Sequence, residues 1–238
     1  MRVLALDTTT RAGSVAVAED GRVLVERTGD AARTHAERLP AEVTDALTAA
    51  HLTLADIDLF AVASGPGSFT GLRIGIATVQ GFAFVMRKRV APVSALRALA
   101  EAAAAGCQPG TRIAAWMDAH RGEVFSALYE ITAPATGDEV AVLREIEAPT
   151  VATPAGTLER WATIGLPSAV CGDGAALYAD VLGGAICIVP TPPIAGIIAR
   201  VAVAAARDGS TVAPAGVQPL YVRRPDAEVA RDRARLRP

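Results

Sequence analysis

The feature that most constrains the fold is a glycine-rich stretch, SGPGSFTGLRIGIATVQGFAFVM, at Ser64–Met86. It follows the apolar run Ile57–Ala63, which predicts a buried strand. The Gly-Pro-Gly opening predicts a turn, because glycine permits backbone angles that other residues avoid. Ser68 or Thr70 can then cap a helix. We expect that helix to continue to the end of the stretch.

Three glycines lie inside this predicted helix, and each costs about 1 kcal/mol relative to alanine. A helical projection gives one apolar stripe, formed by Leu72, Ile76, Val79, Ala83 and Met86. A second stripe beside it contains Gly71, Ile74, Gly75, Thr78, Gly81, Phe82 and Val85. Together they cover roughly 220°, wider than the ~100° of a helix that packs on one side. The helix is therefore predicted to be buried on two sides, either within its own domain or at a subunit interface.

The first half of the chain has the pattern of a three-stranded meander followed by alternating helices and strands. The predicted strands are Arg2–Asp7, Gly13–Ala18, Arg22–Glu26, Ile57–Ala63 and Val90–Val93, and the predicted helices besides the glycine-rich one are Thr34–Ala50 and Ser94–Ala105. Thr34 and Glu37 form a capping-box pattern. Pro40 is expected to kink or delay the helix that follows.

The second half repeats this pattern. The predicted strands are Thr111–Asp118, Glu123–Glu130, Glu139–Glu147, Ser168–Cys171 and Ala185–Val189, and the predicted helices are Pro154–Trp161, Gly174–Val181 and Pro193–Arg207. A meander followed by alternating helices and strands, used twice, predicts duplicated α/β domains. We expect one lobe at residues 1–105, a second at residues 106–222 and a charged, mobile tail at residues 223–238.

Composition narrows the functional classes. The net charge is −2, and from Arg223 onward the chain carries six arginines against three acids, which leaves about −5 for the rest. No nucleic-acid-binding surface spread over the body is expected. Cys107, Cys171 and Cys187 have no paired spacing and predict reduced thiols of a cytoplasmic protein. The chain begins with a strand and has no apolar run of membrane-spanning length, so we expect neither a signal peptide nor a membrane anchor.

Several residues could support chemistry, and each also has a structural interpretation. Asp7 with Thr8 could bind phosphate or metal, or form a turn held by local hydrogen bonds. The loop at residues 65–70 could bind an anion but lacks the lysine of a phosphate loop and the spacing of a nucleophile elbow. The run Asp118–Glu123 is either catalytic or a charged hairpin turn.

No metal site is predicted, since the three histidines, His35, His51 and His120, include no pair at ligand spacing on one helix face. The arginine-rich tail could contact RNA or be a solvated chain end. These alternatives stay open on the residues alone.

The stretch Ser64–Gly75, SGPGSFTGLRIG, resembles the signature of the bacterial TsaB proteins, also called YeaZ. These are glycoprotease-like subunits of the machinery that makes threonylcarbamoyladenosine at position 37 of certain tRNAs. Leu4–Thr9, the helix start at His35, the turn Asp118–Phe125 and the run Pro219–Arg223 resemble further landmarks, so the likeness covers nearly the whole chain. His120 is an insertion relative to the family's usual Asp-Ala-Arg turn.

The resemblance implies two ribonuclease-H-like lobes of the actin and sugar-kinase superfamily. It also implies a non-catalytic scaffold or activator for tRNA processing, without a cofactor, that pairs with the TsaD transferase and is joined by the TsaE ATPase. A homodimer would form when the partner is absent, and tRNA would be contacted only indirectly, through the complex. The alternative is a stand-alone enzyme, either a nucleotide-dependent transferase or a glycoprotease-like peptidase.

The resemblance and the two-sided helix together predict the functional surfaces. The expected partner interface, in which two helices of each subunit form a four-helix contact, comprises His35, Leu39, Val43, Leu47, Gly71, Ile74, Gly75, Thr78 and Phe82. Asp7, Thr8 and Asp118 are expected to mark a vestigial nucleotide cleft. On the interface interpretation, Gly75→Leu leaves the folded chain intact and weakens association; if the glycines pack within the domain, it unfolds the chain.

Overall fold

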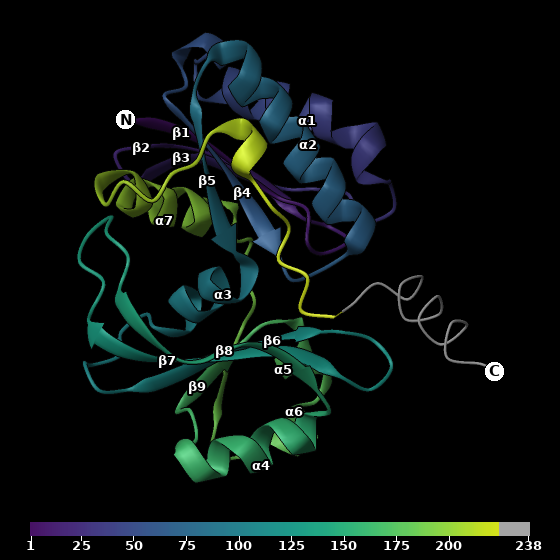
Figure 1. Ribbon diagram of the computed structural model, residues 1–238, viewed down its shortest axis with the longest axis vertical. Helices are drawn as coiled ribbons and strands as arrows, with labels where there is room; N and C mark the ends of the chain where they lie inside the picture. The colour runs from purple at the N-terminus through teal and green to yellow at the C-terminus, as the bar shows by residue number, and fades with distance from the viewer. Residues whose placement is uncertain (224–238) are drawn as a thin grey trace, which may run out of the picture.

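The computed structural model describes residues 1–223, so nearly all of the predicted tail lies outside the described residues. The first sheet has the strand order β3-β2-β1-β4-β5. β1 pairs antiparallel with β2 and parallel with β4 (Figure 1). The bounds are β1 Arg2–Asp7, β2 Ser14–Glu19, β3 Arg22–Thr28, α1 His35–Ala49, β4 Leu59–Gly65, α2 Phe69–Met86, β5 Arg89–Ser94 and α3 Ala95–Ala103.

The second sheet repeats this topology in the order β10-β9-β6-β7-β8, with β6 antiparallel to β7 and parallel to β9. Its bounds are β6 Arg112–Asp118, β7 Val124–Ala133, β8 Val142–Ala152, α4 Pro154–Ile164, β9 Ala169–Cys171, α5 Asp173–Leu177, α6 Ala179–Leu182, β10 Cys187–Val189 and α7 Ala195–Arg207. The predicted duplicated α/β fold with two ribonuclease-H-like lobes is confirmed by this repeated strand order.

Several predicted bounds differ from the observed ones by a few residues, and two elements differ most. The third strand of the second meander was expected at Glu139–Glu147, but β8 runs over Val142–Ala152 and includes Pro149. An edge strand tolerates proline because one row of its N–H groups has no partner strand. The helix expected at Gly174–Val181 is divided into α5 and α6, because Tyr178 leaves helical backbone angles (φ −113°, ψ 34°).

Each lobe ends with a helix that crosses to the other lobe. α3 follows the first sheet along the chain but packs on β6 and β9 of the second. α7 follows the second sheet but packs across β1, β2 and β4 of the first, as Figure 1 shows. Ser14 Oγ accepts a hydrogen bond from Ala195 N (3.0 Å), and Glu26 Oε1 accepts one from Gly196 N (2.7 Å), so the first lobe caps α7.

The prediction that residues 106–222 form the second lobe therefore needs correction. α7 belongs with the first sheet, and the segment after it stays there, since Val212 bridges to Val90 and the 3-10 turn Pro214–Gly216 lies on α2. α7 buries an apolar face, including Ile198 and Ala202, in the core between the sheets, and the strands that it contacts are those of the first sheet.

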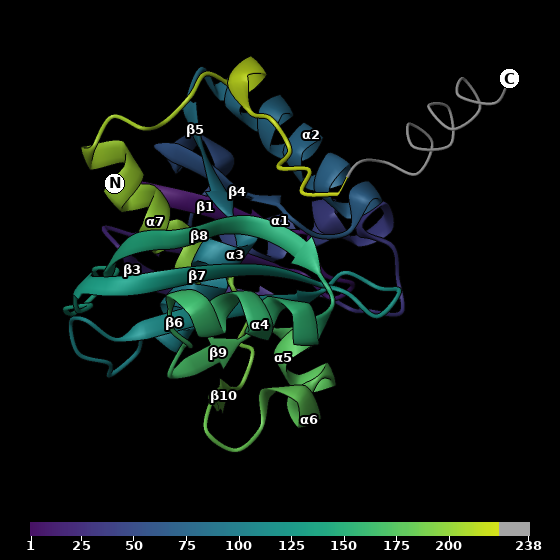
Figure 2. The same ribbon diagram turned by 60° about the horizontal axis from the view of Figure 1, so that its bottom comes forward.

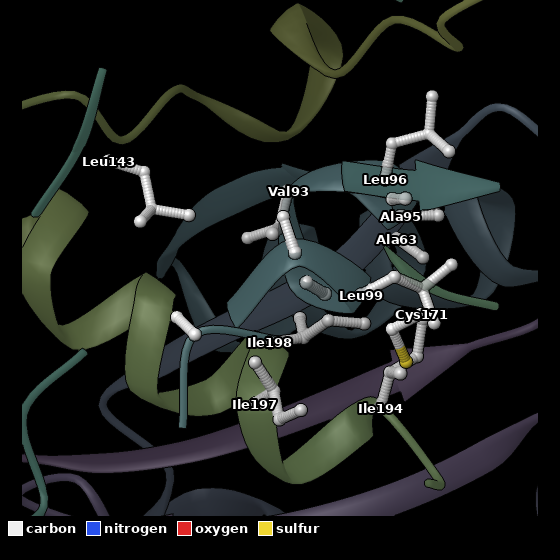
Figure 3. Packing of buried hydrophobic residues seen from close by; sticks show 14 of the residues in the cluster. Ala63, Val93, Ala95, Leu96, Leu99, Leu143, Cys171, Ile194, Ile197 and Ile198 are labelled. Carbon is white, nitrogen blue, oxygen red and sulfur yellow. The ribbon is translucent and has the colours of Figure 1, made fainter. Parts of the chain in front are cut away.

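The layers define three cores. α1 and α2 cover the outer face of the first sheet, and α4, α5 and α6 cover the outer face of the second (Figure 2). Between the sheets, α3 and α7 share a continuous aliphatic core with the inner faces of both. Figure 3 shows its centre, which includes Ala63, Val93, Leu96, Leu99, Leu143, Cys171, Ile194, Ile197 and Ile198. The two lobes are thus joined by buried apolar surface, in addition to the chain connections.

The helix α1 begins where the capping box predicts. Thr34 N donates to Glu37 Oε2 (2.8 Å), and the helix extends from His35 to Ala49 with Pro40 inside it. Pro40 therefore does not delay the helix, although its missing N–H removes the hydrogen bond that residue 40 would otherwise donate to Ala36 O.

Candidate functional site

A cleft of about 950 Å³ lies between the lobes. We call it the inter-lobe cleft. It is lined by the turn after β1 (residues 9–11), the segment before α1 (residues 31–35), the start of α2 (residues 66–72), the turn after β6 (residues 117–121) and the chain end at residues 220–223, with Phe125 and Asp173. The equivalent strands β1 and β6 both end at this cleft, which is where an open α/β fold positions a ligand.

Asp7, at the end of β1, lies just behind the wall of the inter-lobe cleft. It is 4% exposed, and its Oδ1 accepts hydrogen bonds from Thr9 N (2.8 Å) and Thr9 Oγ1 (2.6 Å). Burial raises the pKa of the Asp7 carboxyl above its ordinary value, and the hydrogen bonds from Thr9 offset only part of this effect. The predicted turn held by local hydrogen bonds is therefore present, and the carboxyl is buried within it.

Asp118, at the end of β6, occupies the matching position and lines the cleft. Its Oδ1 accepts from His120 N (2.9 Å), and its Oδ2 lies 3.0 Å from His120 Nδ1. His120, Arg121 and Gly122 all have left-handed backbone angles, with φ between 58° and 76°, which tightens the turn. The inserted His120 thus forms part of this hairpin tip, and its ring is largely exposed.

The loop before α2 is engaged within the chain. Ser68 N donates to Thr9 O (2.8 Å), and Ser68 Oγ accepts from Gly71 N (3.2 Å), so Ser68 is the helix cap. These contacts fix the glycine-rich loop against the turn after β1. The free amides that an anion at this helix start would need are therefore partly occupied by Thr9 and Ser68.

The glycines of α2 are explained by the chain's own backbone. A Cβ on Gly71 would overlap Thr8 O, and one on Gly75 would overlap Thr8 Oγ1 and lie 3.2 Å from Thr8 Cβ. The expectation that these two glycines admit a partner's backbone is thus corrected: the segment that approaches them is the turn after β1. Gly81 differs, because a Cβ there would meet nothing within 4 Å.

Three of the predicted interface residues on α1 face the interior. Leu39, Val43 and Leu47 are 2%, 3% and 7% exposed and belong to the core beneath α1 and α2. Their helical spacing marked an apolar face correctly, but that face packs on the first sheet. A partner cannot contact these side chains in this structure.

His35 is also held within the chain. Its Nε2 donates to Thr10 O (2.9 Å), and its Nδ1 accepts from Arg38 Nη2 (2.9 Å). Arg38 itself is 2% exposed and also donates to Arg11 O and Ala12 O. The pair fastens the start of α1 to the turn after β1, which is a structural role.

The remaining side of α2 is apolar and uncovered. Phe84 and Val85 are 77% and 69% exposed, and Ala77 and Gly81 are exposed beside them. Ile74, Thr78 and Phe82, which the sequence predicted, are half-buried at its edge. We call the set Ile74, Ala77, Thr78, Gly81, Phe82, Phe84 and Val85 the α2 face. Large exposed hydrophobic residues in such a group are typical of an interaction surface.

The sequence did not predict that the chain end covers the polar strip of α2. Gln80 Nε2 donates to Pro214 O (2.9 Å), and Arg73 Nε donates to Tyr221 Oη (3.2 Å). Leu220 N donates to Ser64 O (2.7 Å), so the segment lies along the helix, as the yellow ribbon in Figure 1 shows. The sequence did contain one indication of this contact. The narrow polar strip on an otherwise apolar helix needs polar partners, and the chain end supplies them.

Two further properties concern metals and membranes. Within residues 1–223, no three histidine, cysteine or acidic side chains are grouped as metal ligands would be. α2 is also long and apolar enough, with a mean hydropathy of 1.4, to meet a length and composition criterion for crossing a membrane. It packs one side on its own sheet, and a core helix of a globular protein meets the same criterion.

Comparison with known proteins gives consistent results. The family model TsaD, tRNA N6-adenosine threonylcarbamoyltransferase, matches residues 28–216. The chain is 35% identical over 230 residues to an uncharacterized protein of Mycobacterium leprae, covering 95% of this chain and 56% of that protein. It is 42% identical over 130 residues to the tRNA threonylcarbamoyladenosine biosynthesis protein TsaB of Escherichia coli, covering 55% of each. The alignments therefore span about half the length of these two relatives.

Among solved structures, YeaZ from Pseudomonas aeruginosa is similar, with a TM-score of 0.75 and 31% identity. The likeness covers 92% of this chain and 99% of that one. Both lobes and their relative arrangement are therefore shared with that protein.

Proposed function

Because the chain belongs to the TsaB (YeaZ) family, we propose that it is a non-catalytic scaffold or activator subunit in tRNA threonylcarbamoyladenosine biosynthesis. Its partner in this proposal is a TsaD-type transferase, joined by a TsaE-type ATPase, and it acts in the cytoplasm. In the absence of the transferase it pairs with a second copy of itself. The names of the E. coli relative and of the matching family model support a part in this biosynthesis.

The observation that carries the proposal is the α2 face. Phe84 and Val85 are the most exposed large hydrophobic side chains among the described residues, and Gly81 beside them leaves room for an approaching helix. An aromatic residue and β-branched neighbours without charge are typical of the centre of an interface. The expected interface is thus moved from the buried residues of α1 to this side of α2.

The vestigial nucleotide cleft remains part of the proposal. The inter-lobe cleft supports it by its position at the ends of β1 and β6. Asp7 is buried and hydrogen-bonded to Thr9, and Asp118 is hydrogen-bonded to His120. A cleft whose two carboxylates already accept hydrogen bonds within the chain fits a vestigial nucleotide site.

The test is co-elution with a purified TsaD-type transferase in size-exclusion chromatography, followed by assay of threonylcarbamoyladenosine formation with TsaE-type ATPase present. We expect a stable complex and a rate that depends on adding this chain. Phe84→Asp should weaken association at least tenfold, because it buries an unpaired charge. Leu177→Asp is the matched control, since Leu177 is 60% exposed on α5, outside the α2 face.

If Phe84→Asp and Leu177→Asp weakened association with the transferase equally, the α2 face would not be the interface. The alternative, a stand-alone transferase or peptidase, predicts turnover by the isolated chain. ATP hydrolysis or peptide cleavage by the pure protein, lost on Asp118→Ala, would overturn the non-catalytic role.

A further inference from the structure

The arginines of this chain are distributed unevenly, and several gather at the inter-lobe cleft. Arg11, Arg33, Arg121 and Arg223 line it, against two acids, Asp118 and Asp173. The chain as a whole has a net charge of −2, so this cleft is a local positive region on an otherwise acidic body. Positive charge concentrated in a cleft attracts a polyanion even when the whole protein is negative.

The two acids are already engaged by neighbouring donors. Asp173 Oδ1 accepts from Asp118 N (3.0 Å) and Gly174 N (2.9 Å), and Asp118 accepts from His120. Arg223 is matched by Glu123 and Ala119 O. Arg11 and Arg33 are exposed, and they come from two different segments that meet at the opening. They are the strongest candidates for contact with an anionic ligand.

An exposed aromatic pair forms one wall of the same cleft. Phe69 and Tyr221 are 41% and 40% exposed, with ring centroids 5.4 Å apart. The Arg73 guanidinium lies 3.9 Å from the Phe69 centroid, and its Nε bonds to Tyr221 Oη (3.2 Å). Aromatic rings held rigidly beside arginines are the arrangement on which unpaired bases stack in single-strand binding proteins.

The size of the cleft and the sequence beyond it agree with a strand as ligand. A volume of about 950 Å³ is at the upper end of the roughly 300–1,000 Å³ found for ligand clefts. From Arg223, at the opening, the sequence continues with five further arginines and three acids. A lone phosphate would leave most of this cleft unfilled.

We propose that the inter-lobe cleft binds a short single-stranded RNA segment. Arg11, Arg33 and Arg121 contact the sugar–phosphate chain, and an unpaired base stacks on the Phe69–Tyr221 pair. The inference rests on the proposed function, which makes tRNA the RNA concerned. It departs from the expectation, implied by the family resemblance, that tRNA is reached only through the complex.

The test measures fluorescence anisotropy of a labelled 12-nucleotide single-stranded RNA with the full chain, at 50–200 mM salt. Arg11→Glu/Arg33→Glu should weaken binding at least tenfold. It should also reduce the slope of log affinity against log salt concentration by the amount expected for about two lost phosphate contacts. The matched control, Arg27→Glu/Arg144→Glu, makes the same charge change at exposed positions on β3 and β8. It should bind as the parent does.

A second pair of variants tests the stacking wall. Tyr221→Ala should weaken binding about tenfold, whereas Tyr221→Phe retains the ring and should restore it. Melting temperatures within 2–3 °C of the parent, about the effect of a sub-kcal/mol change, would show that the variants are folded. An RNA duplex of equal length should bind more weakly than the single strand.

Three results would overturn the inference. The first is an equal loss of RNA affinity in both charge variants, and the second is an affinity for the RNA duplex equal to that for the single strand. The third is complete displacement of the RNA by ADP, which would indicate a mononucleotide site. Binding that disappears on truncation after Arg223 but survives Arg11→Glu/Arg33→Glu would assign the RNA to the tail instead. Failure of the proposed function is separate. A parent chain that co-elutes with the transferase but binds no RNA contradicts only this inference, and one that binds RNA but does not co-elute with the transferase contradicts the scaffold role.

Discussion

Thr8 lies directly against Gly75, and the space that a side chain at position 75 would need is occupied by the Thr8 hydroxyl. Thr8 is fully buried, and its Oγ1 has no hydrogen-bond partner. The long helix α2 and the turn behind the inter-lobe cleft are therefore in direct van der Waals contact. A change on either side is transmitted to the other by packing, since buried contacts of this kind are not easily deformed.

Gly75→Ala should consequently destabilise the chain, by about 1–3 kcal/mol, because the added methyl group overpacks a closed site. Gly81→Ala should instead hold or raise stability by up to about 1 kcal/mol, since alanine favours the helix and the site is open. Urea denaturation of the two variants measures the contrast. Adding Thr8→Ala to Gly75→Ala should recover part of the loss. Equal stability of both glycine variants would contradict the packing described here.

The buried carboxyl of Asp7 makes stability depend on pH. Its pKa is raised by burial above the ordinary value of 3.8, so the folded chain holds this proton to higher pH than the unfolded chain does. Stability therefore falls as pH rises from about 4 through the raised pKa, by up to ~1.4 kcal/mol per pH unit. Asp7→Asn keeps the acceptor for Thr9 and removes the charge. Its advantage over the parent should grow between pH 4 and pH 7.

Asp56 provides the control for this pH series, because its pKa is lowered by hydrogen bonds from Thr53. Asp56→Asn should lose stability relative to the parent at pH 7, and the difference should vanish as pH falls toward 3. The free energy of unfolding of each variant relative to the parent is measured by urea denaturation at each pH. If it changed with pH in the same way for both variants, the burial of Asp7 would not be the cause of the pH dependence.

Arg38 should be needed for the start of α1. Arg38→Met leaves the carbonyls of Arg11 and Ala12 without their donor and Glu42 without its ion pair, which lies at 2.5 Å. The expected cost is about 3 kcal/mol, typical of breaking a buried pair. Arg33→Met, at an exposed position five residues earlier, should change stability by less than about 0.5 kcal/mol. Chemical denaturation of both variants decides between a structural and a surface role.

Arg223 fastens the chain end to the turn after β6. Its guanidinium donates to Ala119 O (2.6 Å) and to Glu123, and lies 5.6 Å from the Phe125 ring centroid. In Arg223→Ala, the turn amides Ala119 N and Glu123 N should exchange hydrogen about fivefold faster, equivalent to about 1 kcal/mol. Arg207→Ala, which removes an exposed pair with Glu139, should leave this exchange unchanged. Unchanged exchange in both would contradict the role of Arg223.

The local patterns predicted the duplicated topology because each strand and helix follows its neighbour along the chain. They could not identify what fills the space beside Gly75, since Thr8 is far away in sequence and only the folded chain brings it there. For the same reason, Leu39 and Leu47 were assigned to a partner: a single apolar stripe looks the same whether it faces a subunit or a sheet. The half-buried residues Ile74 and Thr78 were identified because α2 is apolar on more than one side.

The crossing of α3 and α7 between lobes bears on how such a chain could have arisen. A single half, ending with its last helix, would leave that helix without the strand it covers, but two copies could cover each other. That arrangement is a domain-swapped dimer. Linking two such copies end to end turns the swap into one polypeptide in which each crossing helix still covers the other half's sheet, which is the arrangement of α3 and α7 here.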